Sequence, residues 1–407
     1  MSSAAVISAW LMVMAAAFLA YTYVGYPWLM SRLQRRALAA RASPPVAETD
    51  AQPLPAMTVI ISAYNAAEHL PAKVASCLAL DYPAELLSVL VVSDGSTDAT
   101  EQVVQPLSAA DARVRLLAFA ERRGKSACLN DAVAAASTPL LLFTDARQRL
   151  DAAAARRLAA HFADPAVGGV SGALEIAASD GADGVVASAG LYWQMEKKLR
   201  AAEAAVHSTV GATGAIYALR REAFAPIPAE TILDDVLIPM AAVMAGWRVL
   251  YDMQAVAFDA ASVSESQERR RKIRTLAGNF QLLALRPSLL SPRRNPLWWQ
   301  FASHKIFRVL APVAMAVFLV GNAVLAAASS GWLALGLSLL LAAQVVVYLV
   351  AALPEGQGAL WQCLPLRVLK TLRGFVRLQW FAVLGFIWFV RNRQPQLWQT
   401  TQHAASR

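Results

Sequence analysis

Acidic side chains stand at the ends of apolar segments, where they could do phosphate and proton chemistry. Asp94 and Asp145 each follow a short run of apolar and small residues. There, Asp94 can accept hydrogen bonds from a nucleobase or a ribose, and Asp145 can hold a hard cation beside a diphosphate. Asp234 and Asp235 precede an apolar segment. One of this pair can act as a general base with a raised pKa, because adjacent like charges resist joint ionisation. Turn carboxylates and an acidic helix N-terminus are the structural alternatives.

Basic, glycine-rich and aromatic segments add further candidates. The run QERRRKIR at 267–274 offers guanidinium groups that suit a diphosphate, or a patch at a membrane surface. Gly211 and Gly214 permit close backbone approach to a sugar or lipid acceptor, or mark a tight turn. Trp193, on a predicted helix, can stack on a sugar ring or pack in a core. Lys125 can contact a phosphate or a base, or simply begin a helix.

A sheet is predicted to position these residues. Strands are expected at 57–62, 88–93, 114–118 and 139–144, and helices at 67–80, from about 96 and at 125–136. Strand–helix alternation with continuous apolar strands favours a mostly parallel sheet covered on both faces. Polar clusters at 63–65, 94–96 and 145–147 follow three strands, where ligands bind to such sheets. No dinucleotide fingerprint is present, and Gly124-Lys125-Ser126 lacks the upstream glycine of a P-loop.

Composition points to a membrane. The 407 residues are 57% hydrophobic and 16% charged, whereas soluble domains are about a quarter charged. The mean hydropathy of +0.42 excludes a disordered chain and argues against an entirely soluble one. The net charge of +9 fits nucleic acid, an anionic membrane or phosphate-bearing substrates. Cys77, Cys128 and Cys363 are too far apart in sequence to suggest a disulfide framework or a zinc site, which favours a reducing compartment. His207 and His304 have no obvious metal partners, and we interpret them as structural or interfacial.

Uncharged segments predict membrane helices at both ends of the chain. No charged residue precedes Arg32, and the basic residues follow the apolar stretch, which predicts an uncleaved anchor with the N-terminus outside. The uncharged block 309–354 is long enough for two spans, at about 306–328 and 332–352. A weaker segment at 374–390 contains Arg377, and it either crosses the membrane or lies at its surface. If it crosses, the basic tail ends outside, against the positive-inside rule.

The predicted organisation follows from these segments. It comprises an anchor at 1–31, a basic, proline-rich linker at 32–56, an α/β domain at 57–285, an interfacial segment at 286–305, two transmembrane helices within 306–352, an amphipathic segment at 353–373, a further transmembrane or re-entrant helix at 374–390, and a basic tail at 391–407.

Seven motifs in order resemble those of the family-2, inverting glycosyltransferases of GT-A (Rossmann-like) fold with membrane anchors. The motifs are VIISAYN at 59–65, VVSDGSTD at 91–98, GKSACLN at 124–130, FTDAR at 143–147, GATGAIY at 211–217, LDDVL at 233–237 and QERRR at 267–271. The resemblance covers about 57–285 and extends to the flanking helices. It implies a GT-A domain with one N-terminal and two or three C-terminal transmembrane helices.

The resemblance also implies roles for the candidate residues. Tyr64 and Asp94 would bind the nucleoside of a nucleotide-sugar, most often a UDP-sugar, and Lys125 would lie near the nucleotide. Asp145 would help to hold a divalent cation, Mg²⁺ or Mn²⁺, on the diphosphate. Asp235, matching the last aspartate of the family's T-E-D motif, would be the general base.

Two further motifs of the family are matched only in part by this sequence. Gln267 and Arg270 match the Q-x-x-R-W element of polysaccharide synthases, which lies over the diphosphate and acceptor, but its tryptophan is Arg271 here. That tryptophan stacks on the acceptor in processive enzymes, so Trp193 could replace it. The second acidic position of D-x-D is Arg147, which could itself neutralise phosphate charge.

The sequence therefore predicts a glycosyltransferase in the inner membrane, with a cytoplasmic catalytic domain. It would move a sugar from a nucleotide-sugar to a glycan or lipid-linked acceptor, in envelope or exopolysaccharide synthesis, in contact with membrane lipid and with possible export or accessory subunits. The alternatives are a single-addition transferase on a lipid carrier and a non-catalytic, nucleotide-binding membrane subunit. Nucleic acid is not an expected partner, because the basic residues cluster near the membrane spans.

Overall fold

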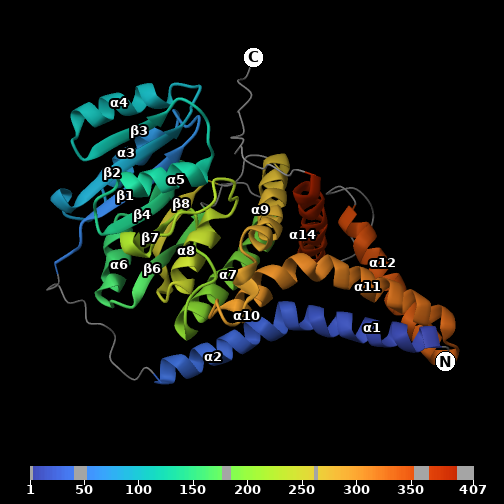
Figure 1. Cartoon of the computed structure of the whole chain (residues 1–407). Coiled ribbons are helices and arrows are strands. Elements are labelled where there is room, and N and C mark those ends of the chain that lie inside the picture. The colour runs from blue at the N-terminus through green and yellow to red at the C-terminus, as the bar shows by residue number, and fades with distance from the viewer. Residues whose placement is uncertain (1–2, 41–52, 177–184, 261–264, 353–365, 392–407) are drawn as a thin grey trace, which may run out of the picture.

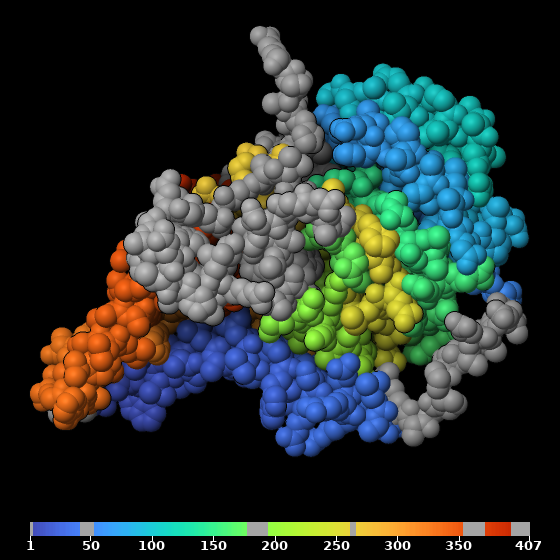
Figure 2. Space-filling view, turned by 180° about the vertical axis from the view of Figure 1, so that it is seen from behind, coloured from blue at the N-terminus to red at the C-terminus, as the bar shows by residue number. Residues whose placement is uncertain are grey.

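The computed structural model describes residues 3–40, 53–176, 185–260, 265–352 and 366–391. An α/β domain forms one part of the molecule, and long helices from both ends of the chain form the other (Figure 1). Seen from behind, α1 and α12 project together away from that domain (Figure 2).

A single sheet of eight strands runs through the α/β domain in the order β3-β2-β1-β4-β7-β6-β8-β5. In chain order the strands are β1 Met57–Ala63, β2 Leu87–Asp94, β3 Val114–Phe119, β4 Leu140–Asp145, β5 Arg149–Leu150, β6 Val167–Ile176, β7 Tyr217–Arg220 and β8 Arg248–Asp259. Strands β3, β2, β1 and β4 are parallel, as are β6 and β8, whereas β7 and β5 run antiparallel to their neighbours. The predicted mostly parallel sheet is confirmed.

The central strands are buried on both faces. Alternate residues of β1 enter two different cores: Val59 and Ile61 pack in one, and Ile60 in the other. Helices α3 (Leu70–Leu78), α4 (Thr100–Ala110) and α6 (Ala154–Ala160) cover the first face. Helices α5 (Lys125–Ala135) and α8 (Asp234–Met244) cover the second. Two-sided burial explains why these strands are continuously apolar.

Short and connecting helices complete the domain. These are the 3₁₀ turns η2 Ala84–Leu86, η3 His161–Ala163, η4 Arg221–Ala223 and η5 Pro287–Leu290, and the long helices α7 Val185–Val206 and α9 Glu265–Leu285. Helix α2 packs along α7, and α14 packs along α9. Helices α7 and α9 therefore connect the α/β domain to the remaining helices.

Among the described residues, four helical stretches are long and apolar enough to cross a membrane: Ser3–Ala40, Trp298–Ala328, Gly331–Ala352 and Thr371–Arg391. They are built from α1 Ser3–Ala20, the π-turn η1 Tyr21–Gly25, α2 Tyr26–Ala40, α10 Trp298–Phe301, the π-turn η6 Ala302–Ile306, α11 Phe307–Ala328, α12 Gly331–Ala352 and α14 Leu366–Arg391. The prediction of one N-terminal and two or three C-terminal apolar helices is thus met with three at the C-terminal end. Residues 353–365 of the predicted amphipathic segment lie outside the described part.

Candidate active site

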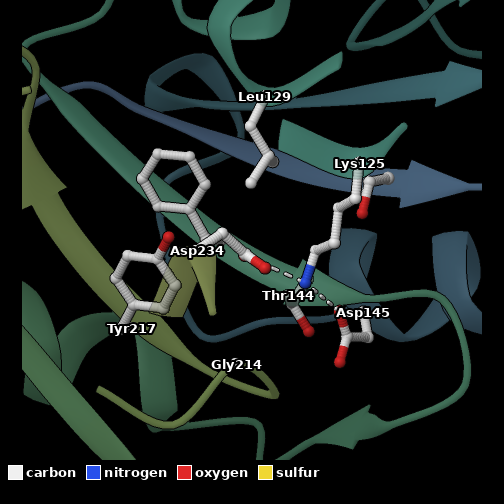
Figure 3. A pocket seen from close by; sticks show the side chains of 9 residues that line it. Lys125, Leu129, Thr144, Asp145, Gly214, Tyr217 and Asp234 are labelled. Carbon is white, nitrogen blue, oxygen red and sulfur yellow. Dashed lines mark hydrogen bonds and ion pairs between the residues drawn. The ribbon is translucent and has the colours of Figure 1, made fainter. Parts of the chain in front are cut away.

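Lys125 connects two acidic residues that are far apart in the sequence. Its Nζ lies 2.9 Å from Oδ1 of Asp145 and 3.1 Å from Oδ2 of Asp234. Figure 3 shows the amino group between the two carboxylates. Burial opposes the charge on Lys125, but Asp145 and Asp234 outweigh it and raise its pKa. The end of β4 and the first residues of α5 and α8 are therefore held together by charge.

A small pocket lies beside this ion cluster. It is lined by Ser62, Lys125, Leu129, Phe143, Thr144, Asp145, Gly214, Tyr217 and Asp234. The rings of Phe143 and Tyr217 stack with centroids 4.7 Å apart. The Tyr217 hydroxyl is buried without a hydrogen-bond partner in the described structure. Burial, and then the charges of Asp234 and Asp235, raise the pKa of Tyr217 well above its usual range.

Asp235 lies next to this cluster and against the 211–214 loop. Its carbonyl accepts a hydrogen bond of 2.6 Å from the amide of Ala212. A Cβ at Gly214 would stand 3.4 Å from Oδ2 of Asp235, and Gly211 has a φ of +85° with a Cβ position 3.2 Å from the Cα of Val236. Both glycines thus permit the loop to pack closely on the start of α8. The structure places both glycines beside Asp235. Their predicted closeness to the acceptor stays a prediction.

The environment of Asp235 suits a general base. Burial, and then the neighbouring Asp234 charge, raise the pKa of Asp235 to about 6, although Lys125, Lys305 and Arg200 oppose this rise. A carboxylate with a pKa near 6 is ionised at neutral pH and still basic enough to accept a proton.

Asp94 organises the loop that precedes Lys125. It is buried at the end of β2, and its two oxygens accept hydrogen bonds from the amides of Arg123 (2.7 Å) and Gly124 (2.9 Å). Tyr64, after β1, lies under the Arg122 guanidinium, whose carbon is 3.7 Å from the ring centroid. Asp94 therefore stabilises this loop through both oxygens, and it would bind a nucleoside in addition to these contacts.

Arg147 pairs with Asp259. Its Nη2 donates to Oδ2 of Asp259 at 2.5 Å, and Nε2 of Gln148 donates to the same oxygen at 3.0 Å. Asp259 is buried at the end of β8. The basic residue at the second position of D-x-D is thus compensated by an aspartate more than a hundred residues away. Within the described residues, no group of three or more His, Cys, Asp and Glu side chains is placed to hold a metal ion.

Helix α9 carries the remaining predicted residues. Arg270 is exposed on it, and Arg271 pairs with Glu268 at 3.0 Å. Gln267 is partly buried one turn earlier. Arg274, at the end of the basic run, is the α9 residue in electrostatic contact with the acidic cluster: burial lowers its pKa, while Asp234 and Asp145 oppose this. The side chain of Trp193 lies outside the described residues.

Sequence reasoning missed several residues of this region. Arg122 stacks on Tyr64, and Arg274 reaches the acidic cluster. Arg200 and Lys305 act on Asp235 from α7 and η6. Only Arg274 carried a sequence signal, because it lies in the basic run. The others become recognisable once distant helices are packed together.

Comparisons with known sequences find partial matches to this chain. The model for "Glycosyl transferase family 2" matches residues 58–227. A succinoglycan biosynthesis protein, ExoU, of Rhizobium meliloti is 40% identical over 88 residues, which cover 22% of this chain and 25% of that protein. An N-acetylglucosaminyltransferase of Azorhizobium caulinodans is 30% identical over 187 residues, which cover 45% of this chain and 47% of that protein. The alignments span less than half the length of either relative.

A solved structure shares the fold. A mannosyltransferase from Pyrobaculum calidifontis, in complex with GDP-Man and Mn²⁺, superposes with a TM-score of 0.70 at 22% identity, covering 94% of this chain and 99% of that one. The GT-A fold predicted from the motifs is confirmed by this likeness. The family-2 glycosyltransferase model thus matches part of the α/β domain, and the fold of the chain agrees with it.

Proposed function

We propose that the chain is a membrane-bound, inverting glycosyltransferase. It transfers a sugar from a nucleotide-sugar, such as a UDP-sugar, to a glycan or lipid-linked acceptor in envelope or exopolysaccharide synthesis. The α/β domain lies on the cytoplasmic side of the inner membrane, where nucleotide-sugars are available, and export or accessory subunits would receive the product. The names of the curated relatives support the reaction class.

One observation carries the proposal. Lys125, Asp145 and Asp234 meet around a pocket at the carboxyl ends of β1 and β4, and Asp235 lies against its edge. Ligands of such sheets bind at these strand ends. The ammonium group of Lys125 suits a diphosphate, which would share a cation with the neighbouring carboxylate of Asp145. The basic carboxylate of Asp235, one residue after Asp234, suits the proton of an attacking hydroxyl.

The chemistry is a single displacement at the anomeric carbon. Asp235 takes the proton of the acceptor hydroxyl as that oxygen bonds to the anomeric carbon. The bond from this carbon to the diphosphate oxygen breaks, and the nucleoside diphosphate leaves with the electron pair. Lys125 and Arg274 lie where their charges favour the leaving group. Most of the rate enhancement then comes from positioning and from charge stabilisation.

A divalent cation fits this site if the donor supplies part of its coordination. Asp145 is the residue that would hold it, because its side chain is 26% exposed and presents hard oxygen ligands. Mg²⁺ or Mn²⁺, when bound, supplies positive charge to the departing diphosphate.

The pairing of Arg147 with Asp259 gives the second candidate function, a non-catalytic nucleotide-binding subunit, because the second acidic residue of D-x-D is missing. Nucleotide-sugar hydrolysis separates the two functions. We expect the purified full chain to hydrolyse a donor slowly, and Asp145→Asn to lose this activity. Asp164→Asn, an exposed aspartate on the same domain, serves as the matched control. Donor binding without turnover in folded wild-type protein would favour the non-catalytic subunit.

A further inference from the structure

Helix α9 packs against the apolar helix α14, and the two lie side by side in Figure 1. Aromatic rings join them. The ring centroid of Phe280 in α9 lies 5.2 Å from that of Phe386 and 6.3 Å from that of Phe389, both in α14. Helix α14 contains one of the stretches that are apolar enough to cross a membrane. A helix suited to a membrane therefore packs directly against the helix that carries the basic run.

Gly385 allows α14 to approach the backbone of α9. A Cβ at this position would stand 3.0 Å from the nitrogen of Ala277 and 3.1 Å from the carbonyl oxygen of Ile273. Because both are backbone atoms, they cannot rotate away as the end of a side chain can. At Gly374, also in α14, nothing in the described part of the chain outside that helix lies within 4 Å of the Cβ position. A larger residue should therefore displace α9 at position 385 and leave it in place at position 374.

The other side of α9 rests on the loop that leads into α8. A Cβ at Gly278 would stand 2.6 Å from Cγ of Leu233 in this loop. Buried Gln281 accepts a hydrogen bond from the amide of Ile232 at 2.8 Å and donates one to the carbonyl of Glu230 at 2.7 Å. Helix α9 is thus held between α14 and this loop. A displacement on the α14 side should also disturb the contacts on the loop side.

Helix α9 also brings Arg274 to the acidic cluster. Arg274 lies within the stretch 273–277, whose backbone Gly385 approaches. Burial disfavours the charge on Arg274 and lowers its pKa, and the charges of Asp234 and Asp145 oppose this effect. The position of α9 therefore determines how far the Arg274 charge lies from these carboxylates.

We propose that Gly385 is a positioning residue for sugar transfer, because it lets α14 pack on the backbone of α9 and so hold Arg274 beside the acidic cluster. The inference rests on the proposed function for the reaction, whereas the packing that carries it does not depend on that reaction. Helix α14 is then part of the catalytic unit as well as an anchor. Densely packed interiors transmit strain, and misplacement of a reacting group by about 1 Å can cost about a hundredfold in rate.

The first test places leucine at two positions of the same helix. Gly385→Leu and Gly374→Leu are prepared as full chains in nanodiscs, and kcat and KM are measured for hydrolysis of the nucleotide-sugar that the wild-type protein turns over. We expect Gly385→Leu to lower kcat by at least about tenfold and to change KM by less than about twofold, because the candidate nucleoside residues are not on α9. Gly374→Leu should keep both values. Equal kcat values in the two variants would overturn the proposal.

Alanine at the same two positions keeps the test decisive if the leucine variant does not fold. The Cβ of Gly385→Ala requires the α9 backbone to give by only a few tenths of an ångström, so this variant should fold. We expect it to lose about twofold or more in kcat relative to Gly374→Ala. An unchanged kcat in that comparison would overturn the proposal.

A second substitution shows whether the effect passes through Arg274. If Gly385 acts by holding this charge in place, Gly385→Leu should lower kcat by less than about twofold when Arg274→Met is already present. The same fold loss with and without Arg274→Met would overturn the route through Arg274.

Amide hydrogen exchange separates this inference from the proposed function, because it needs no turnover. The reporter is the amide of Ile232, whose hydrogen bond to Gln281 joins the loop to α9. We expect this amide to exchange faster in Gly385→Leu than in Gly374→Leu. That difference in a protein without turnover contradicts the proposed function and keeps the packing role of Gly385. Wild-type turnover, with equal exchange and equal kcat in the two leucine variants, keeps the proposed function and overturns the inference.

Discussion

Replacing Asp235 by asparagine separates catalysis from stability. The substitution keeps the shape of the side chain and removes its charge and its basicity. Loss of a general base typically lowers a rate by about 10²–10⁴-fold, or about 3–5 kcal/mol of transition-state stabilisation. We therefore expect Asp235→Asn to reduce sugar transfer by at least about a hundredfold, while nucleotide binding is retained.

The same substitution should stabilise the folded protein above pH 6. The pKa of Asp235 rises from 3.8 to about 6 on folding, because of burial and then of Asp234. About two pKa units correspond to about 3 kcal/mol by which the ionised carboxylate disfavours folding. A raised pKa in a folded acid means that this cost is absent below about pH 4, grows as the pH rises and is complete above the folded pKa. The asparagine variant lacks the cost throughout.

The assay combines transfer kinetics with thermal unfolding in detergent near pH 8 and near pH 4. We expect Asp235→Asn to unfold at a higher temperature than wild type near pH 8 and at a similar temperature near pH 4. Asp252→Asn is a control with the opposite expected sign. Burial alone would raise the pKa of Asp252, but the hydrogen bond with His161 lowers it. The Asp252→Asn variant should therefore be less stable than wild type at neutral pH. Undiminished transfer by Asp235→Asn, or lower stability near pH 8, would refute the reasoning.

Three further substitutions test the surroundings of the site. Lys125 lowers the pKa of Asp235, so Lys125→Met should move the acidic limb of the pH–rate profile to higher pH, and an unchanged limb would contradict the contact. Gly211→Ala forces a side chain onto a residue with a φ of +85°, close to α8. This should lower the free energy of unfolding by roughly 1–3 kcal/mol and reduce the unfolding midpoint. An unchanged midpoint would show that the loop can relax. Arg147→Ala leaves buried Asp259 with one partner fewer, so stability should fall while the KM for the donor stays constant; a raised KM would instead place Arg147 on the diphosphate.

Local signals predicted the first half of the sheet well. Strands expected at 57–62 and 88–93 are found at 57–63 and 87–94, and the helix expected at 125–136 ends one residue earlier. Their apolar runs are continuous because both faces are buried. Strand β6 gave no such signal, since it contains three glycines. A Cβ at Gly168 would stand 2.5 Å from Trp247, and one at Gly172 would stand 2.4 Å from the carbonyl oxygen of Ala255. Close packing thus requires small residues where sequence patterns would suggest a loop.

The candidate site, like the sheet, was predicted only in part from the sequence. Polar residues after β1, β2 and β4 meet at one edge, as parallel topology requires. The partner of Arg147 could not be predicted, because Asp259 comes from the other end of the domain. His304 was expected to be structural or interfacial. Its contacts with Glu196 and Glu203 could not be predicted, because they depend on the packing of α7 against the apolar helices. The sequence can indicate such residues, and the packing determines their partners.

The most direct test of the proposed donor site is a screen of nucleotide-sugars. The purified protein in nanodiscs is mixed with UDP-, GDP- and dTDP-sugars, with Mg²⁺ or Mn²⁺ or with EDTA, and released nucleoside diphosphate is measured. We expect turnover of one donor class, strongly reduced by EDTA and by Asp145→Asn, because Lys125 and Asp145 lie together at the pocket. Folded protein that neither binds nor turns over any of these donors would contradict the assignment.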